Sequence, residues 1–519
     1  MVRRNRKAGV LVLCLRGEEK RSVAVATQGK RWYRPRNVVL AVVAVSVLWL
    51  VWGMYRAVTA KPGRAVDFNQ QMYDLAASHQ PGKEGDPNAW DSLLQAIELA
   101  TRAEEQFTAA IGGKDAKPDD WPSDWGFPFD YSAVREARAP DLVVEPTLRV
   151  MELIRREGVH DKLSELASRP RALRPKPEGR LVWVMVPEAG RARNLARLCA
   201  ARMYVAHGAG DETEQIEAFE HLLALGRVLA SQPLLIERLV GIAIISLALH
   251  ELRYEMADEP LTPDACRAAL AAMERQLDGL PPITMHLEAE RLMVLDTVQW
   301  THSDDGRGSG RLLLTELARF KQEVNGEGPA HGITGHPIVN VAGIFFPSKA
   351  TVVAKVNEIF DEMHAYAEGS RAERDAMGFD FDAEVEALPR GHMLLRMLLP
   401  ALGRSVASDD QWRMELNGTR LLLALRLYQY DHGKFPERLE ELVPSYLQAL
   451  PVDPVSGRSY GYRRLSPEED STKWGYIVYS LGRDGQDDGG AAHPQGKFSA
   501  LRPDGAGYDF VINASRGEK

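Results

Sequence analysis

The amino-acid sequence predicts a mostly α-helical, membrane-anchored protein that ends in a small α+β module. Three observations lead to this fold class. One uncharged apolar run, residues 38–55, is long enough to cross a bilayer. Apolar residues recur at helical spacing from Trp90 to about Arg404, without sustained strand alternation. Strand-like alternation is confined to the last part of the chain, around residues 460–465 and 476–481.

The N-terminal region combines a basic tail, residues 1–37, with a transmembrane helix, residues 38–55. The tail holds eleven Lys and Arg against two Glu, a net charge of +9. Because the whole chain of 519 residues carries −8, the part after the apolar run carries −17. The positive-inside rule then places the tail in the cytoplasm and the bulk of the chain outside. Trp49, Trp52 and Tyr55 gather at the far end of the run, where aromatic rings prefer the membrane interface.

We therefore expect a single-pass protein of the inner (cytoplasmic) membrane of a bacterial envelope. A cleaved signal peptide is the alternative. The apolar run is long for a signal peptide, and no good small-residue cleavage site follows it closely. An uncleaved anchor is the interpretation that we keep.

We interpret residues 56–88 as a linker and residues 89–408 as a helical extracytoplasmic domain. Residues 239–249 are apolar but too short to span a bilayer, so we expect a buried helix there. Acidic residues at 211–214 favour the start of a helix, since carboxylates are stabilised at helix N-termini. Helical periodicity predicts further helices over 93–107, 216–225, 283–300 and 352–366.

Two loops and two of the three cysteines require an interpretation. The aromatic segment Asp119–Tyr131 favours a loop folded onto the helices, with a sugar- or partner-binding surface as the alternative. The polar, Gly-rich segment His302–Gly310 lacks the Gly-Lys-[Ser/Thr] end of a phosphate loop, so we expect a flexible connection. Cys199 and Cys266 are either two small buried residues or, outside the cytoplasm, a disulfide.

The C-terminal module, residues 409–519, is predicted to be a helix packed on a small antiparallel sheet. Asp409 and Asp410 favour a helix start, and Gly433 favours its end because Gly takes the left-handed conformation at low cost. The helix between them is apolar nearly all round, which is typical of a helix buried on more than one side. A helical turn over 437–442 and strands around 460–465 and 476–481 should follow.

These residues resemble a known family. The motifs Leu-Tyr-x-x-Asp-x-Gly-x-Phe-Pro, Leu-x-x-Leu-Val-Pro-x-Tyr-Leu, Leu-Pro-x-Asp-Pro, Tyr-x-Tyr and Ser-Leu-Gly-x-Asp-Gly occur in this order at residues 427–436, 439–447, 450–454, 460–462 and 480–485. The segment resembles the C-terminal domain of the major pseudopilin of type II secretion systems, which is type IV pilin-like. The resemblance implies a pilin-like helix and sheet and a link to secretion. Residues 1–408 carry no such resemblance.

At its N-terminus the chain departs from the pattern of that family. A pilin-type protein begins with a short basic leader, a Gly-Phe cleavage site and a Glu near the start of an apolar helix. Here Arg36 and Asn37 precede the apolar run, and the run contains no Glu. We therefore do not expect leader processing or assembly into a pseudopilus.

An acidic loop after the second strand is the candidate metal site. Asp484, Asp487 and Asp488 lie among glycines, and hard cations prefer oxygen ligands on such sharp turns. The segment resembles the start of a calcium loop, although Gln495 stands where a bidentate Glu would be expected. In pseudopilins the corresponding loop binds calcium, so the resemblance implies these three carboxylates as ligands and calcium as cofactor. A solvated turn is the alternative.

The sequence contains no hydrolase elbow, zinc-protease helix or dinucleotide fingerprint. Glu217–His221 and His286–Glu290 each share a helix face, which permits a metal site if the two faces meet; surface pairing is the commoner arrangement. The leading interpretation is a non-enzymatic envelope protein of binding, assembly or scaffolding type. We expect the membrane and envelope proteins as partners, and no nucleic acid. The alternative is an extracytoplasmic hydrolase with its site in the helical domain.

Overall fold

The computed structural model describes residues 35–63, 66–110, 140–304, 309–325, 336–399, 402, 404–466, 468–470, 474–496, 501–502 and 506–513. The fold is mostly helical, with one small three-stranded antiparallel sheet, as predicted. The chain divides into two compact units. The small unit comprises residues 1–61 and 312–345, and the large unit comprises residues 62–311 and 346–519.

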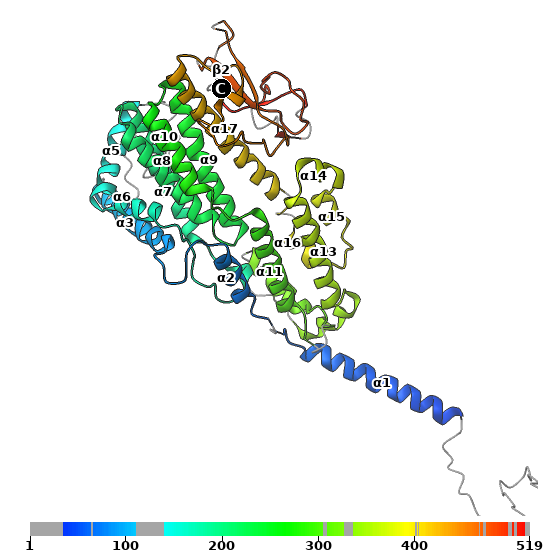
Figure 1. Cartoon of the computed structure of the whole chain (residues 1–519). Helices are drawn as coiled ribbons and strands as arrows, with labels where there is room; N and C mark the ends of the chain where they lie inside the picture. The colour runs from blue at the N-terminus through cyan, green and yellow to red at the C-terminus, as the bar shows by residue number, and fades with distance from the viewer. Residues whose placement is uncertain are drawn as a thin grey trace, which may run out of the picture. The chain divides into compact units, whose positions relative to one another are not determined.

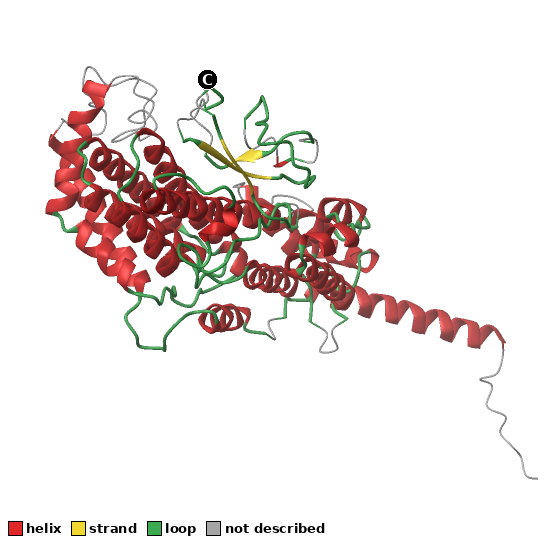
Figure 2. Ribbon diagram, turned by 45° about the horizontal axis from the view of Figure 1, so that its top comes forward, coloured by secondary structure: helices red, strands yellow, loops and turns green. Residues whose placement is uncertain are grey.

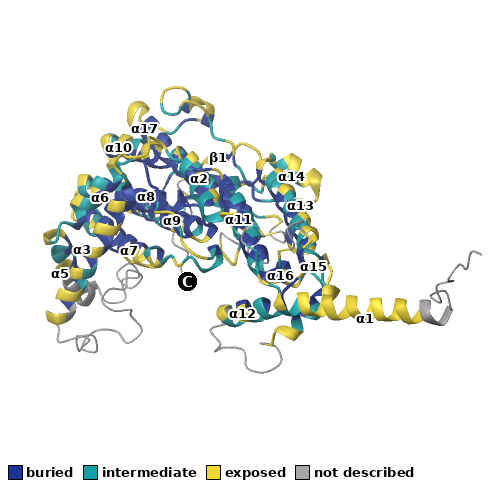
Figure 3. Ribbon diagram, turned by 90° about the horizontal axis from the view of Figure 1, so that it is seen from below, coloured by how far each residue is buried: buried dark blue, intermediate teal, exposed yellow. Residues whose placement is uncertain are grey.

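The small unit contains α1 (Pro35–Thr59), α12 (Leu314–Asn325) and the 3₁₀ helix η3 (Pro337–Phe345). Figure 3 shows α1 exposed along most of its described length, and its exposed side chains include Leu48 and Trp49. A helix that is apolar all round and exposed all round is suited to lipid rather than to water. In the part of the chain that the structure describes, Val39–Thr59 by itself has the length and hydropathy of a membrane span, and the pair Pro337–Phe345 and Lys349–Glu368, bent by 61°, has them only when taken together.

The large unit is built around a bundle of long helices. In Figure 1, α7 (Pro187–Gly208), α8 (Glu212–Ala230), α9 (Leu235–Asp258) and α10 (Pro263–Leu277) run side by side. The remaining elements are α2 (Phe68–Ser78), α3 (Ala89–Ala110), α5 (Pro140–Arg156), α6 (Val159–Ser168), η1 (Leu181–Trp183), α11 (Ile283–Thr301), α13 (Lys349–Glu368), α14 (Arg371–Met377), α15 (Phe381–Ala387) and α16 (Met393–Leu398).

Several of the predicted helices are confirmed, and α8 and α9 form the centre of the bundle. Asp211 caps α8 by accepting the Glu214 backbone N–H at 3.1 Å, as the acidic start predicted. The buried helix predicted at 239–249 is the middle of α9. The two helices cross where a Cβ on Gly241 would lie 2.5 Å from the carbonyl oxygen of Gly226. Two facing glycines therefore bring the α8 and α9 backbones into direct contact.

The C-terminal module consists of α17 (Ser405–His432), η4 (Leu439–Leu442), β1 (Gly461–Arg464), β2 (Tyr476–Ser480) and β3 (Phe510–Val511). The sheet order is β1-β2-β3, with Tyr462 opposite Val478 and Tyr479 opposite Val511. Figure 2 shows the yellow strands against the red helices. The two strands expected from sequence are confirmed, and β3 is an addition that the sequence pattern did not indicate.

Helix α17 packs against the sheet on one side and against α9 and α10 on the other. Leu421, Leu423 and Leu425 are all fully buried, which accounts for the all-round apolarity of this helix. One continuous hydrophobic core runs from Ala89 in α3 to Ile512 beyond β3. The helical bundle and the sheet therefore share a core.

The predicted start of this helix at Asp409 and Asp410 is wrong, whereas its end at Gly433, with φ of 72°, is confirmed. The helix begins at Ser405, a full turn earlier. Asp409 is a buried acceptor for Arg238 of α9 rather than a cap. Asp410 accepts a hydrogen bond from Arg374 at 2.5 Å. The carboxylates belong to tertiary contacts because the helix carries them past its first turn.

A second buried ion pair joins α17 to the bundle. Arg253 of α9 donates to Glu415 at 2.8 Å and to the Thr419 hydroxyl at 2.9 Å. Arg253 and Glu415 are both buried, so this contact is shielded from water. Together with Arg238–Asp409 it fixes the position of α17 along α9.

The structure tests the prediction for the two cysteines, but the two predicted loops lie wholly or partly outside the described residues. Cys199 and Cys266 are buried free thiols and not a disulfide, and burial raises the pKa of each to about 12. Asp119–Tyr131 lies outside the described residues. Residues 305–308 of the segment His302–Gly310 also lie outside them.

Candidate functional site

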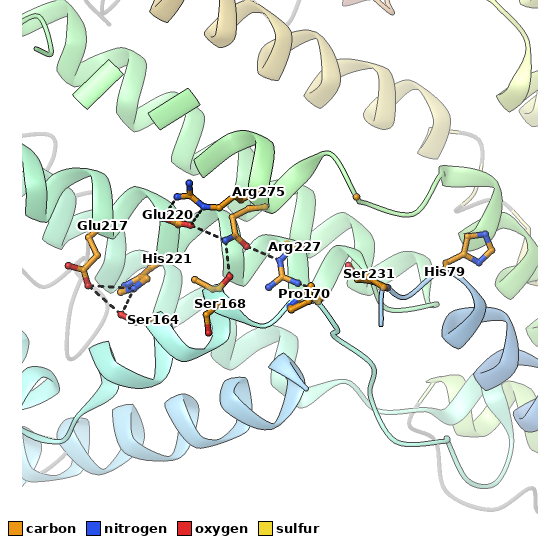
Figure 4. Close-up of a pocket in the computed structure, with 14 residues that line it drawn as sticks. His79, Ser164, Ser168, Pro170, Glu217, Glu220, His221, Arg227, Ser231 and Arg275 are labelled. Atoms are coloured by element: carbon orange, nitrogen blue, oxygen red, sulfur yellow. Dashed lines mark hydrogen bonds and ion pairs between the residues drawn. The ribbon is translucent and has the colours of Figure 1, made fainter. Parts of the chain in front are cut away.

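A cavity of about 770 Å³ opens between α6, α8 and α10 in the large unit. Figure 4 shows the residues that line it. His79 and Ser231 lie towards one end, and Glu217, His221 and Ser164 lie at the other. Both acidic and basic side chains reach this cavity, which suits a ligand with hydrogen-bond donors and acceptors.

A serine and a histidine meet in the wall of the cavity. Ser164 Oγ, from α6, lies 3.0 Å from Nε2 of His221, from α8. Glu217 Oε1 is 3.4 Å from the same hydroxyl and 3.7 Å from the same ring nitrogen (Figure 4). This is the convergence of histidine and carboxylate that would favour the hydrolase alternative, and sequence reasoning missed Ser164. The serine lies fifty-seven residues before the histidine, so no local pattern links them.

The protonation of His221 argues against serine activation. Nη1 of Arg202 lies 3.0 Å from Nδ1 of His221, and a guanidinium can only donate. Nδ1 must therefore accept, and the proton of the neutral ring resides on Nε2, facing Ser164. Burial, followed by the charge of Arg202, lowers the pKa of His221 to about 3, so the ring is neutral. A ring nitrogen that already carries a proton cannot take one from Ser164, as a nucleophilic serine requires.

Arg227 forms the inner wall of the cavity and closes the C-terminal end of α6. It donates to the backbone carbonyls of Leu166, Arg169 and Pro170 at 2.8–3.1 Å, and to Gln276 Oε1 at 2.9 Å. Burial lowers its pKa to about 10, which leaves the guanidinium charged at neutral pH. These bonds satisfy carbonyls that a helix end leaves without partners, so Arg227 has a structural role.

The two Glu–His faces considered from sequence do not form a metal site. His286 is fully buried, and its ring nitrogens lie 3.2 Å and 3.0 Å from the carbonyl oxygens of Pro282 and Ala230. Glu290 accepts the Leu235 backbone N–H at 3.1 Å. Among the described residues, no group of three or more His, Cys, Asp or Glu side chains is placed to hold a metal ion. The surface-pairing alternative is also wrong for this second pair, because both side chains are buried.

The acidic loop places its three predicted ligands in different surroundings. Asp484 is exposed and accepts the Gln486 backbone N–H at 3.1 Å. Asp487 accepts the Tyr479 hydroxyl at 2.8 Å and the Gly489 backbone N–H at 2.9 Å. Several of the carboxylate oxygens thus already accept hydrogen bonds from groups of the loop and the sheet.

Asp509, just before β3, is the acidic residue that sequence reasoning missed. It is fully buried, and its Oδ2 accepts the backbone N–H groups of Asp488 at 3.1 Å and Gly490 at 2.8 Å. Burial, with the charges of Asp488 and Asp487, raises the pKa of Asp509 to about 6. No local pattern indicates Asp509, because it reaches the loop only through the pairing of β2 with β3.

Two carboxylate oxygens near the acidic loop are available as ligands for a cation. Asp509 Oδ1 and Asp488 Oδ2 are buried and have no hydrogen-bond donor within the described part of the chain. A buried carboxylate oxygen without a donor is costly unless a cation compensates it. Asp488 and Asp509 thus offer oxygen ligands of the kind that calcium prefers. Asp484 and Asp487 lie in the same loop with other partners.

Searches for similar proteins found no matching family model, curated protein or solved structure.

Proposed function

We propose that this chain is a membrane-anchored envelope protein of binding, assembly or scaffolding type. In this proposal α1 crosses the inner membrane, residues 1–37 lie in the cytoplasm, and the chain after Arg56 lies outside. The C-terminal module is pseudopilin-like and is linked to secretion. The burial of α17 inside the chain's own bundle is the observation that carries the proposal.

A pilin-like helix that is to assemble with copies of itself needs a free apolar face. In this chain the face of α17 opposite the sheet is covered by α9 and α10. Buried ion pairs from Arg238 and Arg253 hold it there. The module is therefore a rigid head on the helical bundle. Recognition of a partner falls to the sheet and the loops around it, not to the helix.

Binding rather than hydrolysis is the role that we assign to the cavity. Its hydroxyl and imidazole are in contact, but the proton on Nε2 of His221 leaves Ser164 without a histidine base. A fluorophosphonate probe, which labels activated serines, distinguishes the two roles on the full chain in detergent micelles. We expect no labelling of Ser164. Labelling that is lost in Ser164→Ala and kept in the control Ser168→Ala would favour the hydrolase instead.

The topology is tested in intact spheroplasts with added protease. The positive tail and the apolar α1 predict digestion of the region after Arg56 and protection of residues 1–37. Permeabilised spheroplasts, in which both parts should be digested, are the control. Protection of the C-terminal module in intact spheroplasts would contradict the proposed orientation.

A calcium site in the acidic loop is a second element of the proposal, supported by the orphaned oxygens of Asp488 and Asp509. A bound cation would offset the repulsion among the carboxylates and hold the loop against β3. Sites in extracellular modules bind calcium at about 10⁻⁴–10⁻³ M, so millimolar calcium is the appropriate test.

We expect millimolar calcium to raise the Tm of the full chain in detergent, because a ligand that binds the folded state stabilises it. Magnesium should raise it less, since it gives up its water reluctantly. The effect should shrink at pH 5, below the pKa of about 6 for Asp509, because a protonated carboxyl binds calcium poorly. Asp484→Ala with Asp488→Ala should remove it, and Glu468→Ala, outside the loop, should not. No shift with calcium would leave the loop a solvated turn.

A further inference from the structure

In the segment η3 of the small unit a polar residue is buried and large apolar residues are exposed. This is the reverse of a water-soluble helix. Pro337–Phe345, with sequence PIVNVAGIF, contains no charged residue. Its buried positions are Asn340 and Gly343. Ile338, Ile344 and Phe345 are exposed by 50%, 56% and 83%. Burial of the amide and exposure of three large apolar side chains indicate an apolar environment on the outside.

The inward face of η3 is held by specific contacts with the start of α12. Asn340 Oδ1 accepts the Thr315 backbone N–H at 3.0 Å and the Thr315 hydroxyl at 3.2 Å. A Cβ on Gly343 would lie 2.2 Å from the carbonyl oxygen of Leu312, so only glycine permits this approach. These contacts determine which side of η3 faces inward. The exposure of its apolar side therefore follows from the packing and not from a loose loop.

Within the small unit, η3 also packs against α1. The side chains of α1 from Val39 to Tyr55 are exposed, whereas Ala57 and Val58 are half-buried, so the contact lies towards the end of the helix. The same end carries Trp52, with the Arg56 guanidinium 4.9 Å from its ring centroid. Trp beside Arg is typical of the membrane–water interface.

From this geometry we infer that η3 is a second membrane contact. It lies in the interfacial layer beside the end of α1 and inserts Ile338, Ile344 and Phe345 among the lipid acyl chains. The inference rests on the proposed role of α1 as a membrane anchor. Because η3 packs against α1, whose apolar side chains are exposed, lipid and not a protein partner is the occupant that we assign to the apolar side of η3.

The length of η3 shows whether this helix could cross the membrane or only lie at its interface. Nine residues of 3₁₀ helix rise about 2 Å each, or about 18 Å in all. The hydrocarbon core is about 30 Å thick, so η3 cannot span it. A helix of this length with one apolar side is suited to lying within one leaflet at the interface.

The test places an environment-sensitive fluorophore on single cysteines of the full chain in nanodiscs of phosphatidylethanolamine and phosphatidylglycerol. Cys14 is replaced by Ser, and the buried Cys199 and Cys266 are retained. Phe345→Cys reports on η3, and Arg319→Cys, on an exposed position of α12, is the matched control. Because both side chains are exposed, neither change should disturb the fold, and circular dichroism checks this.

We expect the probe at position 345 to shift to the blue and to lose emission when brominated lipids replace ordinary ones. The probe at 319 should do neither. A probe at 345 that behaves like the one at 319 would overturn the inference. A blue shift without quenching by brominated lipid would overturn it too, since protein and not lipid would then cover η3.

A third probe separates failure of this inference from failure of the anchor. Trp49→Cys places the fluorophore on α1 itself. Quenching by brominated lipid at 49 but not at 345 would reject the contact of η3 and keep the anchor. Absence of quenching at both positions would reject the anchor and, with it, the contact of η3.

Discussion

Removal of the Asp409 carboxylate should destabilise the protein by disrupting the contact between the C-terminal module and the bundle. Arg238 is fully buried and donates to Asp409 through Nε at 3.2 Å and through Nη2, and to the Pro281 carbonyl at 3.0 Å. Asp409 also accepts Trp412 Nε1 and Arg413 Nε, each at 2.9 Å. Although burial opposes ionisation of Asp409, Arg238 and Arg413 hold its pKa below the ordinary value. The carboxylate is therefore charged and compensates a buried guanidinium.

The expected cost follows from what Asp409→Ala leaves behind. Breaking a buried ion pair costs about 3–5 kcal/mol, because the remaining charge has neither water nor partner. The buried Trp412 indole loses its acceptor, which costs roughly 1 kcal/mol more. Arg413 is 41% exposed at its side chain and can return to water, so it adds little. We expect a loss of about 4–6 kcal/mol in the free energy of unfolding.

The assay is chemical denaturation of the full chain in detergent micelles, followed by circular dichroism. Asp278→Ala is the matched control, since the Asp278–Arg420 pair also joins α17 to the bundle but Asp278 is 52% exposed. An exposed pair contributes about 0–1 kcal/mol. Arg238→Met combined with Asp409→Leu should recover much of the loss, because no charge is then left buried. Equal costs for Asp409→Ala and Asp278→Ala would refute the reasoning.

Three further predictions concern the core and its ionisation. Leu423→Ala and Leu427→Ala should each cost about 2–5 kcal/mol in denaturation, because both side chains are buried in the shared core; near-zero change for both would mean that α17 is exposed. Gly241→Ala should lower the Tm although Ala favours helices, since its Cβ would lie 2.4 Å from a backbone nitrogen of α8; a higher Tm would contradict this close crossing. Burial raises the pKa of Glu255 to about 8 and of Glu290 to about 7. The folded state therefore holds protons that the unfolded state releases above about pH 4.5, and stability is lost as pH rises through 7 to 8. Thermal melts should show a lower Tm at pH 9 than at pH 6, and Glu255→Gln should reduce the difference; a Tm independent of pH would exclude the effect.

The candidate sites show how far local sequence patterns extend. The glycines and acids of residues 484–490 located the loop, because turn chemistry is local. Asp509, which supplies the buried carboxylate there, follows the loop by about twenty residues and reaches it only through the pairing of β3. Ser164 and His221 likewise come from separate helices, and the position of the proton on His221 depends on Arg202 from a third. Chemistry built across elements was not predictable from spacing along the chain.

The sequence by itself determined the helical class, the apolar α1, the start of α8 at its Asp211 cap, the end of α17 at Gly433 and the burial of α17 on two sides. Each of these depends on side-chain periodicity or on contacts within four residues, which a local pattern records. Tertiary structure alone decided that Asp409 pairs with Arg238 instead of capping a helix. It also decided that η3 belongs with α1 to the small unit and that its Ile338, Ile344 and Phe345 are exposed. These outcomes depend on which surfaces meet, and that is settled by the packing of the whole chain at once and not by any one segment.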